Sequence, residues 1–188
     1  MNMLSVTRAG ANFVASKAAT ESSQPSAASA VRYVSEIKET LGEMWMPRLY
    51  RERILILRTR SHELEVSPRG SEAEVQHTLL GVELKIGRRR MLCPDLATAR
   101  YLAVFARAGC PAVAVPYDIT RISRLADELE SSWHRMLLLV EHLAAERSAN
   151  FRSRIRGLLL AEVRGEIAEA GAGTAVPKFN QNTKQRRG

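Results

Sequence analysis

One stretch in the middle of the chain limits the available folds more than any other. It begins with Val82, Leu84 and Ile86, which alternate with two charged side chains. This spacing predicts a half-buried β-strand that carries both charges on its other face. Gly87 and the three arginines after it predict a turn, and residues 91–93 predict a returning strand. The stretch therefore opens with two neighbouring strands of a sheet.

A helix and another strand follow this strand pair. Pro94 and Asp95 are start signals for a helix, and Gly109 is a stop signal. Residues 112–115 lie between two prolines and predict a short buried strand. A strand, a helix and a strand in this order predict a crossover unit, in which both strands belong to one sheet and the helix lies across it.

The segments before this stretch predict one helix and further strands. Residues 31–41 place apolar side chains on one face of a helix. Residues 53–60 are apolar throughout their centre, which is typical of a central strand. Residues 62–66 alternate between polar and apolar side chains and predict a second strand, whereas residues 74–80 fit either a strand or a short helix.

Two helices are predicted after the stretch. Asp118 or Thr120 can cap the first of them. The second carries an apolar residue at every fourth position: Phe151, Ile155, Leu159, Val163 and Ile167. The predicted fold class is therefore α/β, with a small mixed β-sheet and flanking helices in an αβββαβ-like order, plus a C-terminal helical extension.

We expect four segments along the chain. Residues 1–29 are predicted to be a disordered or targeting-like segment, residues 30–117 an α/β core, residues 118–171 C-terminal helices and residues 172–188 a disordered basic tail. Residues 1–20 carry basic residues and no acidic ones, which is typical of an organellar transit peptide and equally of a bacterial N-terminus. No apolar run approaches the roughly 20 residues of a membrane helix, so we expect no membrane partner. Cys93 and Cys110 are too few for a secreted disulfide framework, so we expect a reduced, cytoplasmic compartment. Association with a nucleoid and organellar targeting both stay open.

The distribution of charge points to an anionic partner. The formal net charge is +8, and residues 45–115 contribute +5 from twelve basic and seven acidic side chains. The last eighteen residues hold four basic side chains and no acidic one. Such an excess on one region and its tail predicts contact with a polyanion such as nucleic acid. The alternative is a solvated basic surface in an arginine-rich chain. Aromatic residues make up only 5% of the chain, which disfavours a single-strand binder that relies on base stacking.

Glu83 and Lys85 are the pair of residues most suggestive of chemistry. Strand periodicity places both side chains on one face. A carboxylate in that position can hold a divalent metal through oxygen ligands, and a neighbouring ammonium can orient an attacking water. The other interpretation is an exposed ion pair on an amphipathic strand.

The tripeptide from Glu83 to Lys85, with the helix and strand after it, resembles the (D/E)-x-K motif of the PD-(D/E)-x-K nuclease family. Over residues 30–116 the chain is most similar to the archaeal Holliday-junction resolvase branch. This resemblance implies catalytic roles for Glu83 and Lys85, and a Mg²⁺ ion held by Glu83 and a second carboxylate. The family's metal-binding Asp has no counterpart before Glu83, because the first Asp of the chain comes later. Glu65 is the best-placed substitute.

Two groups of basic residues are predicted to contact nucleic acid without reading its sequence. They are Arg88, Arg89 and Arg90 in the turn, and Lys184, Arg186 and Arg187 in the tail. We therefore predict a nucleic-acid-associated protein with a nuclease-like core. It is either a Mg²⁺-dependent endonuclease or a non-enzymatic binder with a degenerate site. The alternative from another class is an interaction protein that docks a partner helix, or a second copy, through residues 118–170.

Overall fold

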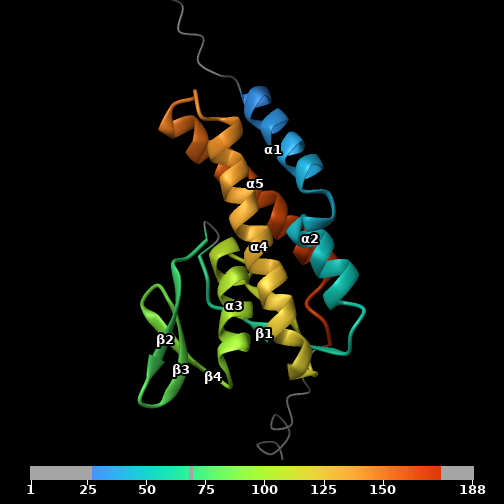
Figure 1. Ribbon diagram of the computed structural model, residues 1–188, viewed down its shortest axis with the longest axis vertical. Helices are drawn as coiled ribbons and strands as arrows, with labels where there is room; N and C mark the ends of the chain where they lie inside the picture. Colours follow the sequence, from blue (N-terminus) through green and yellow to red (C-terminus); the bar gives the residue numbers. More distant parts are fainter. Residues whose placement is uncertain (1–26, 68–69, 175–188) are drawn as a thin grey trace, which may run out of the picture.

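The computed structural model describes residues 27–67 and 70–174, in which helices lie beside two small β-sheets (Figure 1). In chain order the elements are α1 (Ala27–Leu41), a 3-10 turn η1 (Gly42–Met44), α2 (Met46–Leu49), a π-helical turn η2 (Tyr50–Ile54), β1 (Thr59–Glu63), β2 (Ala73–Thr78), β3 (Gly81–Ile86), β4 (Arg89–Cys93), α3 (Leu96–Ala108), β5 (Ala112–Pro116), α4 (Ile119–Leu143) and α5 (Ala149–Ala170). The predicted α/β class with a C-terminal helical part is confirmed.

The strands form two separate antiparallel sheets. Strands β2, β3 and β4 make a three-stranded meander, and β1 pairs with β5. In the meander Leu84 lies opposite Val75 and Met91, while Lys85 lies opposite Glu74 and Arg90. The predicted alternation of β3 is confirmed, since Leu84 is buried and Lys85 is partly exposed.

The prediction of a crossover unit is wrong. Strand β4 belongs to the meander and β5 to the other sheet, so the two strands around α3 do not share a sheet. The reason lies in α3 itself. A crossover helix covers a sheet with one face and exposes the other, whereas α3 is buried around most of its circumference. The meander covers one side of α3, and α4 packs along another.

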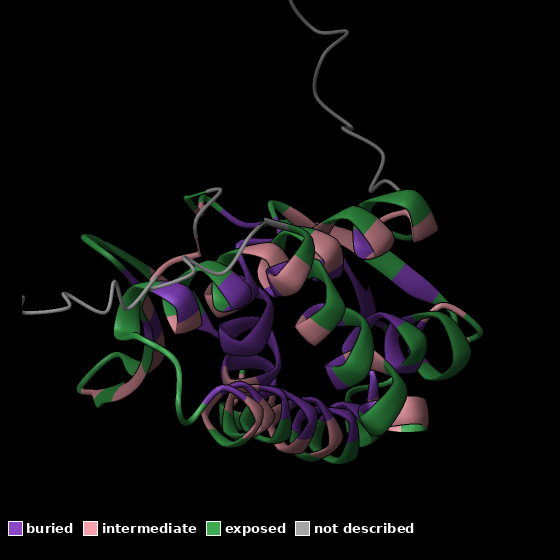
Figure 2. Cartoon of the chain, turned by 90° about the horizontal axis from the view of Figure 1, so that it is seen from above, coloured by how far each residue is buried: buried purple, intermediate pink, exposed green. Residues whose placement is uncertain are grey.

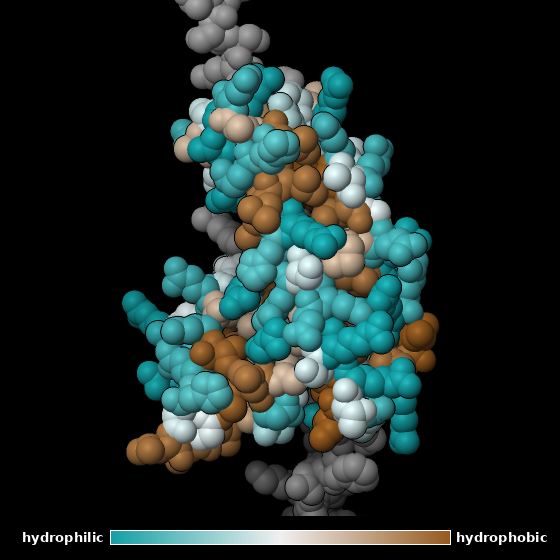
Figure 3. Space-filling view, viewed as in Figure 1, coloured by the Kyte–Doolittle hydropathy of each residue, from teal (hydrophilic) through white to brown (hydrophobic). Residues whose placement is uncertain are grey.

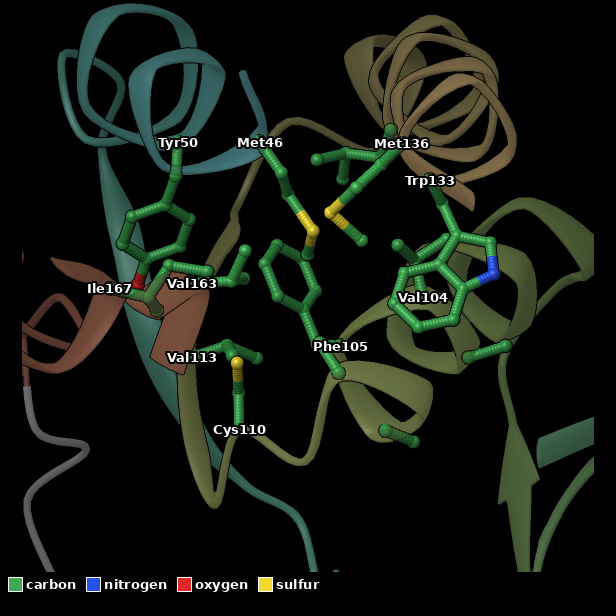
Figure 4. Packing of buried hydrophobic residues seen from close by; sticks show 14 of the residues in the cluster. Met46, Tyr50, Val104, Phe105, Cys110, Val113, Trp133, Met136, Val163 and Ile167 are labelled. Carbon is green, nitrogen blue, oxygen red and sulfur yellow. The ribbon is translucent and has the colours of Figure 1, made fainter. Parts of the chain in front are cut away.

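Helix α3 forms the centre of the hydrophobic core. Most of its residues are buried, and Figure 2 shows the purple buried segments gathered in the interior of the molecule. The ring of Phe105 lies 5.6 Å from that of Tyr50 and 5.1 Å from that of Tyr101. Figure 4 shows the same ring beside Met46 and Met136, which come from α2 and α4. The core therefore joins elements from both halves of the chain.

The ends of α3 follow the signals in the sequence. The Asp95 carboxylate accepts a hydrogen bond from the Thr98 amide at 2.7 Å and caps the first turn. Gly109 ends the helix with a left-handed φ of 78°, and a Cβ there would lie 2.9 Å from the carbonyl oxygen of Ser67. Glycine is thus required at this position for both its conformation and its small size.

The predicted central strand over residues 53–60 is also wrong. Met46, Tyr50 and Ile54 are fully buried at four-residue spacing, so the chain is helical until Ile54. Ile56, in the middle of the predicted strand, is 74% exposed. The extended conformation begins only at Thr59.

The other predicted strands differ less from the structure. The strand expected over residues 62–66 lies earlier, and Glu63 is its last residue. The ambiguous segment at residues 74–80 is a strand that ends at Thr78 and turns through Leu79 and Leu80.

The two C-terminal helices belong to the core. Asp118 caps α4 by accepting a hydrogen bond from the Thr120 amide at 3.1 Å, and Ser148 caps α5. The apolar stripe of α5, from Phe151 to Ile167, is buried, and this helix packs mainly on α1. The stripe is therefore not free to dock a partner helix, and this route to an interaction protein is removed. One apolar cluster includes the α/β segment and both C-terminal helices.

An ion-pair network also joins the first and last helices. The carboxylate of Glu166 accepts hydrogen bonds from Lys38 Nζ at 2.6 Å, Trp45 Nε1 at 3.1 Å and Arg51 Nη2 at 2.9 Å. Burial tends to raise the pKa of Glu166, but hydrogen bonds from Lys38, Trp45 and Arg51 outweigh it and hold the pKa below its usual value. Glu166 thus stabilises the fold as a carboxylate.

The last described residues are fixed to the sheet of β1 and β5. The Tyr50 hydroxyl donates a hydrogen bond to the carbonyl oxygen of Gly171 at 2.7 Å, and burial raises the pKa of this tyrosine to about 12. The Ser61 amide donates to the carbonyl oxygen of Thr174 at 2.8 Å. Most of the predicted tail, residues 175–188, lies outside the described residues. None of the described helices is both long and apolar enough to span a bilayer.

Candidate nucleic-acid interface

Glu83 and Lys85 share the outer face of the meander, as predicted. The Glu83 side chain is 13% exposed, and its Oε1 accepts a hydrogen bond from the Thr78 hydroxyl at 3.3 Å. Its Oε2 lies 3.7 Å from Arg90 Nη1 and has no hydrogen-bond partner among the described residues. Lys85 Nζ lies 3.8 Å from a carboxylate oxygen of Glu74 on the neighbouring strand. Both side chains thus take part in cross-strand ion pairs, and Glu83 is the more deeply buried of the two.

The structure does not bring Glu65 to Glu83. Glu65 lies beyond the end of β1 and forms an ion pair with Arg89, whereas Glu83 lies beside Arg90. Arg89 and Arg90 both line a hollow of about 510 Å³ that includes Glu65 and does not include Glu83. Within residues 27–67 and 70–174 there is no group of three His, Cys, Asp or Glu residues that could hold a metal ion. Mg²⁺ is usually held by one or two carboxylates together with water and phosphate oxygens, and Glu65 does not supply the second carboxylate that was predicted beside Glu83.

The arginines of the β3–β4 turn are mostly engaged with acids. Arg89 is paired with Glu65 and Arg90 lies beside Glu83, and both residues belong to β4. Only Arg88 is at the tip of the turn, exposed and, within the described part of the chain, without an ion pair. Because carboxylates lie beside two of its three arginines, this turn offers little net positive charge to a phosphate backbone. The predicted tail contacts Lys184, Arg186 and Arg187 lie outside the described residues.

A more basic surface lies at the end of the molecule where α4 begins, at the lower edge of Figure 1. Five arginines from two distant segments form it: Arg53, Arg121 and Arg124 line one hollow, Arg58 lies over the ring of Tyr117, and Arg60 lies opposite Val115 in the sheet of β1 and β5. We refer to these five arginines, with the two carboxylates of Asp118 and Glu128, as the basic end. The two segments are joined by a hydrogen bond from the Tyr117 amide to the carbonyl oxygen of Arg58, at 3.1 Å.

The two carboxylates orient three of these arginines. Glu128 accepts hydrogen bonds from Arg53 Nη1 at 2.9 Å and from Arg124 Nε at 3.0 Å. Asp118 lies 3.4 Å from Arg121 Nε. The hydroxyl and amide of Thr120 lower the pKa of Asp118 by hydrogen bonding to it, so it is ionised at neutral pH.

The basic end keeps a positive excess. Arg58 and Arg60 form no ion pair with an acid among the residues that the structure describes. Five guanidinium groups against two carboxylates leave a net charge of +3. The backbone of Arg60 also forms an isolated parallel β-bridge with Thr174, the last described residue. The chain beyond Thr174 holds four more basic residues. The basic tail therefore starts beside the basic end.

Exposed apolar side chains lie among these arginines. Ile56 precedes Arg58, and Tyr117 and Ile119 flank the cap of α4; all three are exposed. The guanidinium of Arg58 lies 5.1 Å from the centre of the Tyr117 ring. Figure 3 shows brown apolar patches within the hydrophilic surface at this lower end. The basic end is thus both cationic and amphipathic.

The sequence carried a weak signal for this surface. Arg53, Arg58 and Arg60 flank an apolar run, and Arg121 and Arg124 are three apart on a predicted helix. The interpretation of residues 53–60 as a central strand concealed their proximity to α4.

Comparison with protein-family models, curated proteins and solved structures found no match to this chain.

Proposed function

We propose that this protein binds nucleic acid through the basic end and does not cut it. The observation that supports the proposal is the excess of five arginines over two carboxylates, beside the point where the basic tail begins. Cationic side chains that neutralise phosphates release condensed counterions, and this release drives non-specific binding.

The geometry of the meander favours binding without catalysis. Glu83 and Lys85 lie on one face of β3, as predicted. Glu65, however, pairs with Arg89, whereas Glu83 lies beside Arg90. A metal-dependent nuclease requires several oxygen ligands around the same ion. We therefore propose that any site related to the PD-(D/E)-x-K family is degenerate in this protein.

A salt titration of binding tests the proposal. We would measure fluorescence anisotropy of a labelled oligonucleotide against the full chain at several salt concentrations. The double variant Arg58→Gln with Arg60→Gln should weaken binding and flatten the plot of log K against log salt by up to about 1.4–1.8 units, because each neutralised phosphate contributes about 0.7–0.9 to the slope. Both arginines are exposed and make no ion pair in the described structure, so folding should be unaffected.

A matched control separates position from charge. Arg135→Gln with Arg154→Gln removes the same charge from exposed arginines of α4 and α5 that also lack ion pairs in the described chain. Arg135 lies eleven residues, or roughly 16 Å along the helix, beyond Arg124. This control should leave the slope nearly unchanged. Equal losses from both double variants would contradict a localised interface, and Mg²⁺-dependent cleavage that Glu83→Gln abolishes would contradict the non-catalytic part.

A further inference from the structure

We propose that the basic end prefers single-stranded to duplex nucleic acid, because Ile56, Tyr117 and Ile119 contact unstacked bases. This inference rests on the proposed function and names the class of nucleic acid that the same surface takes. It concerns side chains that phosphate binding alone does not explain.

These three apolar side chains are open to solvent. Ile119 is 64% exposed, Ile56 is 74% exposed and half of the Tyr117 surface is open to solvent. Scattered exposed apolar residues are common on proteins, but these three lie within one arginine-rich surface. A partner that meets this surface must therefore offer both anionic and apolar groups.

The architecture of nucleic acids decides which form does so. A duplex presents phosphates on its outside and only base edges within its grooves, so exposed isoleucines would meet charged backbone. A single strand exposes the faces of its bases next to its phosphates. Such strands bind to basic grooves with aromatic platforms, and unpaired bases also pack against apolar side chains. The mixture of arginine and isoleucine at the basic end fits the second arrangement.

The pairing of Arg58 with Tyr117 supplies a planar platform. The guanidinium lies 5.1 Å from the ring centre, and in the described structure this arginine has no acidic partner to hold it elsewhere. Planar guanidinium and phenol groups both stack on bases. The low aromatic content argues against a ladder of several rings, but a single ring between two isoleucines requires no such ladder.

A hollow lined in part by Ile56 and Thr120 adds room for a nucleotide. Its volume is about 470 Å³, and its lining includes Leu57 and Leu125 as apolar residues and Arg53 and Arg124 as cationic ones. Glu128 bonds both arginines and so fixes their positions. The apolar lining can take a base face while the arginines take the adjoining phosphate.

An anionic lipid surface is the competing partner, because cations and exposed apolar side chains also suit the membrane interface. The stacked pair of Arg58 and Tyr117 favours nucleic acid, since planar groups match bases better than they match acyl chains. Vesicles with anionic headgroups therefore belong in the binding experiment as a third partner.

The test compares a single strand and a duplex with equal numbers of phosphates, by anisotropy with the full chain. Tyr117→Ser and Ile119→Ser should each weaken single-strand binding by about tenfold and leave duplex binding nearly unchanged. Leu138→Ser is the matched control, because Leu138 is 67% exposed on the same helix and outside the basic end. It should change neither affinity. Melting temperatures of all variants would establish that they remain folded.

The outcomes separate this inference from the proposed function. Tighter single-strand binding that depends on Tyr117 and Ile119 supports the inference. Equal binding of both forms, unaffected by these variants, overturns the inference and leaves the proposed function standing. Binding of neither form overturns both. Binding only to vesicles with anionic headgroups also overturns both and assigns the surface to lipid.

Discussion

Leu159→Ala should destabilise the protein by about 3–4 kcal/mol. Leu159 is fully buried in the middle of α5, which packs on α1, α3 and α4. The substitution removes three carbons, which costs about 2.4 kcal/mol at about 0.8 kcal/mol per carbon. The cavity left behind adds to that cost, since surrounding side chains relax only in part. For a chain of this length the melting temperature should fall by roughly 6–16 °C.

Chemical denaturation alongside sizing provides the assay. Leu138→Ala is the matched control, because it makes the same change on the exposed side of α4 and should cost no more than about 0.5 kcal/mol. A Leu159→Ala variant that melts like the wild type would refute the burial of this side chain in the core. A variant of normal stability that loses a dimer or a partner would show that the α5 stripe is a docking face after all.

Other parts of the structure give three further expected outcomes. Glu166 has a lowered pKa, so its contribution is present above about pH 4.5 and is lost as the pH falls through that lowered pKa; the difference in melting temperature between wild type and Glu166→Gln should shrink in acid. Deletion of residues 176–188 removes four cations, so it should leave the melting temperature unchanged and flatten the salt slope of nucleic-acid binding by up to about 3–4 units. Leu79→Ser with Leu80→Asp changes two exposed side chains at the β2–β3 turn, so stability should stay within about 0.5 kcal/mol; a larger loss would reveal a contact that the monomer lacks.

Local patterns predicted individual elements well. The alternation of Val82, Leu84 and Ile86 determined the face of β3, because period two places all three apolar side chains on the face that buries Leu84 and Ile86. Asp95 and Gly109 marked the ends of α3, because their preferences act on the backbone nearby. These signals are local, and tertiary packing agreed with them.

The arrangement of the elements was less predictable. Residues 53–60 are apolar enough for a strand, yet Met46, Tyr50 and Ile54 also have helical spacing. The packing of that helical turn against α3, through Tyr50 and Phe105, favours the helix over the strand. Likewise α3 carries few polar residues, which was a signal that it would be surrounded rather than lie across one sheet face.

In the candidate site, too, local features were predictable from the sequence and long-range contacts were not. Strand periodicity correctly placed Glu83 and Lys85 on one face, but the position of Glu65 depends on the path of the chain after β1. The basic end requires Arg58 and Arg121 to meet across more than sixty residues of sequence. Such proximity follows from tertiary structure, and single-sequence patterns do not carry it.

The most direct measurement of nucleic-acid binding at the basic end is photo-crosslinking of a single-stranded oligonucleotide to the full chain, with the crosslinked peptides mapped by mass spectrometry. We expect crosslinks within residues 53–60 and 117–124, together with the tail, and their disappearance in the variant that combines Arg58→Gln with Arg60→Gln. Crosslinks confined to the β3–β4 turn around Arg88, or insensitive to that variant, would contradict binding at the basic end.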